Sequence, residues 1–147
     1  MVTSVGIQNN AYTLIMRLMD LEKDAIAAYD ELLERLDQAE NKAEVGRFRQ
    51  DHETHFELLK EFAATHEVPP PEKPDEKGLL AKWRLKVADL VGDDRALLKA
   101  MRGLEGDLVD AYEATLANRV LPDEMKPAVE RALSDEHRHK AWMDEAG

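Results

Sequence analysis

Two parts of this sequence carry the same order of carboxylate, phenol and imidazole side chains. Each copy has a glutamate, a tyrosine seven positions later, and two candidate metal ligands three positions apart further along the chain. The first copy consists of Glu22, Tyr29, His52 and His55, and the second of Glu105, Tyr112, Glu136 and His139. Carboxylate oxygens and imidazole nitrogens bind divalent transition metals. The repeat therefore predicts a metal site to which both halves of the chain contribute.

The spacing of these residues suits helices that face a common interior. A helix turns once in about 3.6 residues, so side chains at i and i+3 lie on one face. Glu22 and Glu105 stand where the apolar stripes of their segments continue, and a carboxylate buried without a partner is costly. Three carboxylates in one layer raise each other's pKa, and a divalent cation removes that repulsion. We therefore expect six metal ligands: Glu22, His52, His55, Glu105, Glu136 and His139.

Tyr29 and Tyr112 lie two helical turns after the two glutamates, on the same stripes. We expect their hydroxyls to donate hydrogen bonds to ligand carboxylates from across a bundle; ordinary core tyrosines with satisfied hydroxyls are the alternative. Histidine ligands favour iron, manganese or zinc over magnesium or calcium. A metal-free network, in which the carboxylates and imidazoles pair with one another, is the competing interpretation of the whole set.

Four long helices must position these residues. Apolar residues recur at helical spacing, and Leu, Ala, Glu and Lys greatly outnumber strand-forming residues, which is typical of an all-α chain. The helices expected from this pattern cover about residues 9–36, 42–65, 93–118 and 122–145, with Pro127 delaying a regular last helix. The turn at 37–41 is short, so the first two helices are expected to be antiparallel neighbours.

Residues 67–92 differ in composition and are interpreted as a long crossover between two helical hairpins. Residues 69–74 include four prolines, and a short amphipathic helix is expected over residues 78–92. Its apolar side consists of Leu79, Leu80, Trp83, Val87, Leu90 and Val91. The basic residues around Trp83 permit either contact with an anionic membrane or packing of Trp83 on the bundle or on a second copy of the chain. A second copy of the chain, bound through this helix to form a homodimer, is one expected partner.

The expected architecture is thus one domain over residues 1–147, built as a four-helix bundle. Hairpin 1 covers about residues 9–66 and hairpin 2 about 93–147, and the repeat implies a pseudo-twofold axis between them. The net charge of −11 argues against nucleic-acid binding, because phosphates would be repelled. No run of eighteen apolar residues is present, no signal peptide is visible, and cysteine is absent. These features predict a cytoplasmic protein without thiolate ligands or a membrane span.

The motifs resemble those of the ferritin-like superfamily, in the rubrerythrin and bacterioferritin style and especially its small bacterial members. That superfamily has Glu-x6-Tyr on its first and third helices and Glu-x-x-His on its second and fourth. The positions that match are Glu22, Tyr29, His55, Glu105, Tyr112, Glu136 and His139. The resemblance covers nearly the whole chain. It implies a ferritin-like bundle with one long crossover, iron as cofactor, and ferrous oxidation, peroxide removal or a stress role, with oxygen or peroxide as substrate.

One position departs from that pattern. His52 stands where the superfamily has a bridging glutamate, and the adjacent Glu53 points about 100° away around the helix. The site would then have three carboxylates and three histidines, so a mononuclear or asymmetric centre competes with a dinuclear one. The departure weakens the expectation of redox activity. Metal binding without turnover and a metal-free bundle that serves as an interaction protein both stay open as alternatives.

Overall fold

The computed structural model describes residues 4–75, 77–90 and 92–147, and it confirms an all-helical chain: no strand occurs within these ranges. The α-helices are α1 (Ala11–Arg35), α2 (Ala39–Thr65), α3 (Leu79–Val87), α4 (Asp94–Leu116) and α5 (Lys126–Ala146), and a 3-10 turn, η1 (Asp123–Met125), precedes α5. None of the helices in the described ranges is both long enough and apolar enough to cross a bilayer.

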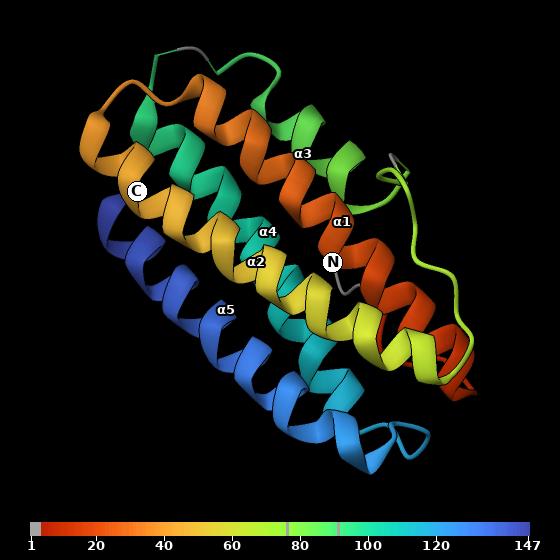
Figure 1. Cartoon of the computed structure of the whole chain (residues 1–147). Coiled ribbons are helices and arrows are strands. Elements are labelled where there is room, and N and C mark those ends of the chain that lie inside the picture. Colours follow the sequence, from red (N-terminus) through yellow and green to blue (C-terminus); the bar gives the residue numbers. More distant parts are fainter. Residues whose placement is uncertain (1–3, 76, 91) are drawn as a thin grey trace.

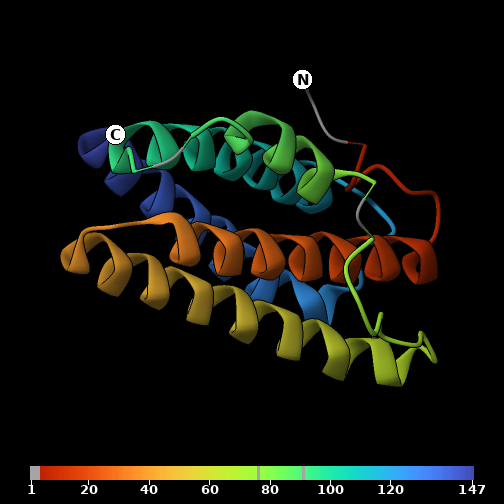
Figure 2. The same cartoon turned by 90° about the horizontal axis from the view of Figure 1, so that it is seen from above.

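The four long helices form a bundle (Figure 1). α1 packs along α2 and α4 packs along α5, and each pair is antiparallel, as the two views show (Figures 1 and 2). The connection from α2 to α4 runs back along the bundle, so α2 and α4 point in the same direction (Figure 2). This connection contains α3, which packs against both α1 and α4. Hairpins of similar structure therefore face each other across a common interior.

Capping side chains account for several helix ends. The Asn10 carboxamide oxygen accepts the backbone N–H of Thr13 at 2.8 Å, and the Asp93 carboxylate accepts that of Ala96 at 3.1 Å. η1 stands before α5 because Pro127, which has no N–H to donate, lies in the first turn of that helix. The expected delay of the last helix by Pro127 is thereby confirmed.

Two predicted boundaries were wrong. α2 begins at Ala39, inside the predicted turn, because the buried Asp94 carboxylate accepts the backbone N–H groups of Asp37 and Gln38 at 2.9 and 3.0 Å and fixes a tighter connection. α3 ends at Val87 rather than near residue 92, because Arg35 donates to the carbonyl oxygens of Val87 and Leu90, at 2.9 and 3.3 Å. Val91, predicted on the apolar side of that helix, lies outside the described residues.

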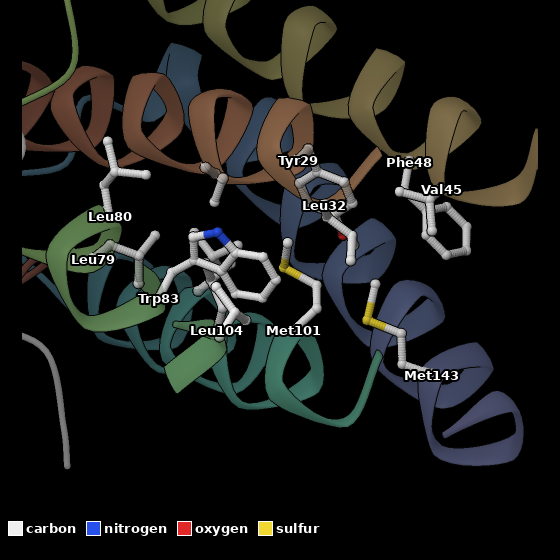
Figure 3. Close-up of a cluster of buried hydrophobic side chains, with 14 of the residues drawn as sticks. Tyr29, Leu32, Val45, Phe48, Leu79, Leu80, Trp83, Met101, Leu104 and Met143 are labelled. Carbon is white, nitrogen blue, oxygen red and sulfur yellow. The ribbon is translucent and has the colours of Figure 1, made fainter. Parts of the chain in front are cut away.

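Two clusters of apolar side chains fill the interior. The first lies toward the end of the bundle where α1 meets α2 and includes Trp83, which is 1% exposed and reaches from α3 toward Met101 and Leu104 (Figure 3). The second lies toward the opposite end and includes Leu14 and Phe56. Trp83 therefore packs on the bundle, as one of the two interpretations of the basic crossover helix predicted, and its ring is not available for membrane contact.

Candidate metal centre

The six residues expected to bind metal come together in one buried layer. On α2, Val45 and Phe48 belong to the first apolar cluster and Leu59 to the second, and the two histidines lie between them. Five of the six side chains are fully buried and the sixth is 3% exposed. The layer consists of Glu22 from α1, His52 and His55 from α2, Glu105 from α4, and Glu136 and His139 from α5.

Glu22 is held by the two histidines of α2. Its Oε1 lies 2.6 Å from Nδ1 of His52, and its Oε2 lies 3.1 Å from Nδ1 of His55. Both α2 imidazoles therefore turn the same ring nitrogen toward one carboxylate. Because His52 and His55 are one helical turn apart, a single carboxylate from the facing helix α1 can contact both.

On the other side of His52 the contacts are longer. The Nε2 atom of His52 lies 3.4 Å from Oε1 of Glu105 and 3.7 Å from Oε1 of Glu136. The Nδ1 atom of His139 lies at the same two distances from the same two oxygens. His52 therefore stands between Glu22 on one side and a group from α4 and α5 on the other.

The hydroxyls of the two tyrosines form hydrogen bonds between the two hairpins. The Tyr29 hydroxyl, on α1, donates to Glu105 on α4, and the Tyr112 hydroxyl, on α4, donates to Glu22 on α1. Both expected hydrogen bonds are therefore present. Burial raises the pKa of each phenol well above its ordinary value, and the neighbouring glutamates raise it further. Both tyrosines thus remain protonated and act as fixed donors to the carboxylates.

Two aspartates that the sequence analysis missed complete the site. Asp135 on α5 lies with its Oδ2 2.8 Å from Nε2 of His55, and Asp51 on α2 with its Oδ2 2.7 Å from Nε2 of His139. Each aspartate thus holds the outer nitrogen of a histidine from the opposite hairpin, and the inner nitrogen, Nδ1, faces the layer. Outer hydrogen bonds of this kind fix the orientation of histidines that bind metals and raise their basicity. Their sequence signal was a repeated Asp-x3-His, at residues 51–55 and 135–139.

Arg138 joins these two aspartates. Its Nη2 atom lies 2.8 Å from Asp51 and 2.9 Å from Asp135, while about half of its side chain stays exposed. Glu53, by contrast, points away from the layer as expected and pairs with Arg49 at 3.1 Å. Charged groups therefore line the outer side of the layer at the seam between α2 and α5.

The pKa shifts differ between the two sides of the layer. Burial alone would raise the pKa of Glu22, but the charges of His52 and His55 outweigh burial and lower it to about 2. Burial likewise opposes charge on the two imidazoles, yet Glu22 raises the pKa of His52 to about 10 and that of His55 to about 9. These three side chains compensate one another's charge. The balance at Glu136 is the opposite, because burial and the charge of the neighbouring Glu105 raise the pKa of Glu136 well above its ordinary value.

The residues of the layer include groups of carboxylates and imidazoles that could hold a metal ion. Among the described residues, the buried side-chain atoms without a hydrogen-bond partner include Oε2 of Glu105, both carboxylate oxygens of Glu136 and Nδ1 of His139. Buried polar atoms are normally paired, because desolvation without a partner is costly. A cation between these atoms would satisfy them and stabilise the charge of Glu136. The mixture of oxygen and nitrogen donors suits iron, manganese or zinc better than calcium or magnesium.

A scan against protein-family models, a search of curated proteins and a search of solved structures each found no match to this chain. Because one fold can host many functions, the chemistry of the site indicates function here and the fold does so only by analogy.

Proposed function

We propose that this chain is a metal-binding protein of ferritin-like type, which holds a divalent transition metal within the buried layer of its bundle. The observation that supports metal binding most is the set of buried carboxylate and imidazole atoms that have no hydrogen-bond partner in the described residues. Two groups of ligand atoms, each within 4.8 Å of one another, offer donor sets for a cation.

The ferritin-like part of the proposal draws on the arrangement of the helices. Two antiparallel hairpins, α1 with α2 and α4 with α5, are joined by a connection that returns along the bundle (Figure 2). Ferritin-like folds also have one long crossover, and their metal ligands are glutamates and Glu-x-x-His pairs that project into the bundle. Iron is the metal that this analogy favours, with manganese and zinc as alternatives.

Oxidation of ferrous iron by oxygen or peroxide is the activity that the same analogy favours. Turnover requires a metal position that oxygen or peroxide can reach, so it is a separate claim from metal binding. We expect ferrous-dependent oxygen or peroxide consumption that Glu105→Gln abolishes. Consumption that is unchanged in this variant would show that the activity does not take place at this site. No consumption by the metal-loaded wild type would leave metal binding without turnover as the function. The predicted homodimer and cytoplasmic location stay predictions.

A metal-free interaction module is the competing function. The hydrogen bonds of Glu22 with His52 and His55 favour it, because that part of the layer is satisfied without a cation. It does not explain the unpaired atoms of Glu105, Glu136 and His139. The metal-free alternative therefore accounts for only half of the site.

Thermal unfolding with and without chelator distinguishes the two functions. We expect the untagged full chain, loaded with ferrous iron or zinc, to lose several degrees of Tm on chelation, since metal stabilises only the folded state. The Glu105→Gln variant should show no such change. Glu113, exposed on the same helix, provides the control: Glu113→Gln should respond like the wild type. An equal Tm with and without metal in the wild type would favour the metal-free alternative.

A further inference from the structure

The layer consists of two groups of ligands that share one residue. Glu22, His52 and His55 form the first group, and the second contains His52 together with Glu105, Glu136 and His139. Nδ1 of His52 faces the first group and Nε2 faces the second. His52 is also the residue that breaks the internal repeat, because the equivalent position in the second half is Glu136. The two halves of the site are therefore not chemically equal.

The donor atoms of the first group are already used. Both oxygens of Glu22 contact a histidine, and Oε2 also accepts the hydroxyl of Tyr112. The remaining nitrogen of His55 lies 2.8 Å from Asp135. A cation placed in this group would have to break contacts that satisfy the carboxylate and both rings. The first group therefore needs no additional cation to pair its buried atoms.

Four atoms of the second group lack a hydrogen-bond partner in the described residues, although Oε1 of Glu105 accepts the hydroxyl of Tyr29. Of the five buried side-chain atoms that lack a hydrogen-bond partner in the described ranges, four belong to Glu105, Glu136 and His139. These residues come from α4 and α5 and are 0% exposed. A hydrogen bond between Glu136 and Glu105 would pair only one oxygen of each carboxylate, whereas a cation would satisfy the carboxylates and His139 together, so the chemistry of the second group points to a bound cation.

The spacing of the second group also suits a single ion. Nε2 of His52 and Nδ1 of His139 each lie 3.4 Å from Oε1 of Glu105, the oxygen that accepts the Tyr29 hydroxyl, and 3.7 Å from Oε1 of Glu136. Nδ1 of His55 also lies 3.7 Å from this Glu136 oxygen, but its ring is held by Glu22 and Asp135. The longer separation exceeds a normal hydrogen bond. Donors arranged tetrahedrally at metal–ligand distances of about 2.0–2.2 Å are themselves about 3.3–3.6 Å apart. Two nitrogens and two carboxylates are the donor set of a four-coordinate transition metal, and the 3.7 Å separations need to shorten only slightly to reach this range.

We propose that the chain binds one divalent transition-metal ion, not two, through His52, Glu105, Glu136 and His139. The hydrogen-bonded group of Glu22, His52 and His55 occupies the place that the internal repeat would otherwise give to a second ion. This inference rests on the proposed function, since it specifies the number and the position of the ions at the same site. His52 is the residue that decides between one ion and two.

The internal repeat supplies a matched pair of variants. Glu22 and Glu105 are equivalent in the repeat, are both fully buried, and both accept a tyrosine hydroxyl. In Glu22→Gln we expect the full chain to keep one bound Co²⁺ ion, with an affinity lowered by less than about tenfold, because the glutamine amide can still bond to Nδ1 of the ligand His52. In Glu105→Gln we expect the affinity to fall by more than about tenfold, the scale of losses at metal sites. Titration of metal-free protein, followed by calorimetry and by the visible absorption of four-coordinate Co²⁺, measures both stoichiometry and affinity.

A third variant should increase the number of ions. His52→Glu places at residue 52 the carboxylate that the repeat has at residue 136. It also removes the imidazole that is bonded to Glu22. We expect this variant to bind two Co²⁺ ions per chain, whereas the wild type binds one. Circular dichroism of each variant checks that the helices remain.

The outcomes separate the two proposals. Two ions of similar affinity in the wild type, or loss of the first ion in Glu22→Gln, would overturn the single-ion inference while metal binding itself would stand. Binding of no Co²⁺ by the wild type would overturn the proposed function and the inference with it. One ion that is retained in Glu22→Gln and lost in Glu105→Gln would support both.

Discussion

At the scale of single residues, the site depends on which atom each histidine presents. His55 and His139 both turn Nδ1 inward because an aspartate from the opposite hairpin holds Nε2. The sequence could predict that these histidines face the interior, since helical spacing determines the face. It could not predict the orientation of the rings, because that depends on Asp51 and Asp135, whose contacts lie 88 and 80 positions away in the sequence.

The two aspartates are expected to differ in importance. Asp51 orients His139, which belongs to the group proposed to bind the ion, whereas Asp135 orients His55, which does not. Asp51→Asn should lower zinc or Co²⁺ affinity by about 10–100-fold, the usual cost of removing a partner of a metal-binding histidine. Asp135→Asn should change it by less than about threefold. Calorimetric titration of both variants checks this; equal losses would indicate that His55 also binds metal.

At the scale of elements, two contacts hold the hairpins and the connection together. Asp94, in the first turn of α4, accepts hydrogen bonds from Asp37, Gln38 and Asn41 at 2.9–3.0 Å. Trp83 anchors α3 between α1 and α4 (Figure 3). Helical periodicity was enough to predict the helices and the buried side of α3. It did not predict where α2 begins or α3 ends, because those boundaries are determined by Asp94 and Arg35 from other elements.

Removing the Asp94 carboxylate should destabilise the bundle in a pH-dependent way. Burial opposes its charge, but the backbone N–H of Asp37 and the other donors outweigh burial and lower the pKa of Asp94. A carboxyl with a lowered folded-state pKa stabilises the fold above its unfolded value, about 3.9, and loses that contribution as the pH falls through the folded value. Asp94→Asn should therefore cost about 1–3 kcal/mol at pH 6.

Urea unfolding of wild type and Asp94→Asn at a series of pH values tests this prediction. The difference in the free energy of unfolding should be largest above pH 5 and should shrink below pH 4. Asp93→Asn is the control, because asparagine also caps helices well and should cost little. A difference that does not change between pH 3 and pH 6 would show that the charge of Asp94 is unimportant.

Truncation of Trp83 tests whether α3 is part of the core. This side chain is 1% exposed and belongs to the first apolar cluster, so Trp83→Ala should cost about 3–5 kcal/mol through lost burial and a cavity. Leu85 on the same helix is 81% exposed, and Leu85→Ala should change stability by less than about 0.5 kcal/mol. Equal effects of the two substitutions on urea unfolding would contradict the packing of α3.

At the scale of the whole molecule, one ion should link the two hairpins. The proposed ligands come from α2, α4 and α5, and Glu105 is also bonded to Tyr29 of α1, so a bound cation contacts or adjoins every long helix. Metal at about 100 times its Kd would add about 2.7 kcal/mol to the free energy of unfolding. Urea unfolding at increasing zinc concentrations should show this gain in the wild type, and its absence there would exclude tight binding to the folded state.

The sequence predicted much of the site because the repeat placed equivalent ligands on four helices. All six predicted ligands and both tyrosines lie in one layer. The division of that layer into a satisfied group around Glu22 and an unsatisfied group around Glu136 was not predicted in detail. It follows from which side of His52 each carboxylate approaches, and that depends on the packing of α1 and α5 rather than on spacing.

Elemental mass spectrometry of the untagged protein, purified without chelators and then equilibrated with ferrous iron or zinc, is the most direct test of the central claim. We predict one transition-metal ion per chain, retained in Glu22→Gln and lost in Glu136→Gln. No bound metal under any of these conditions would contradict metal binding as the function of this buried layer.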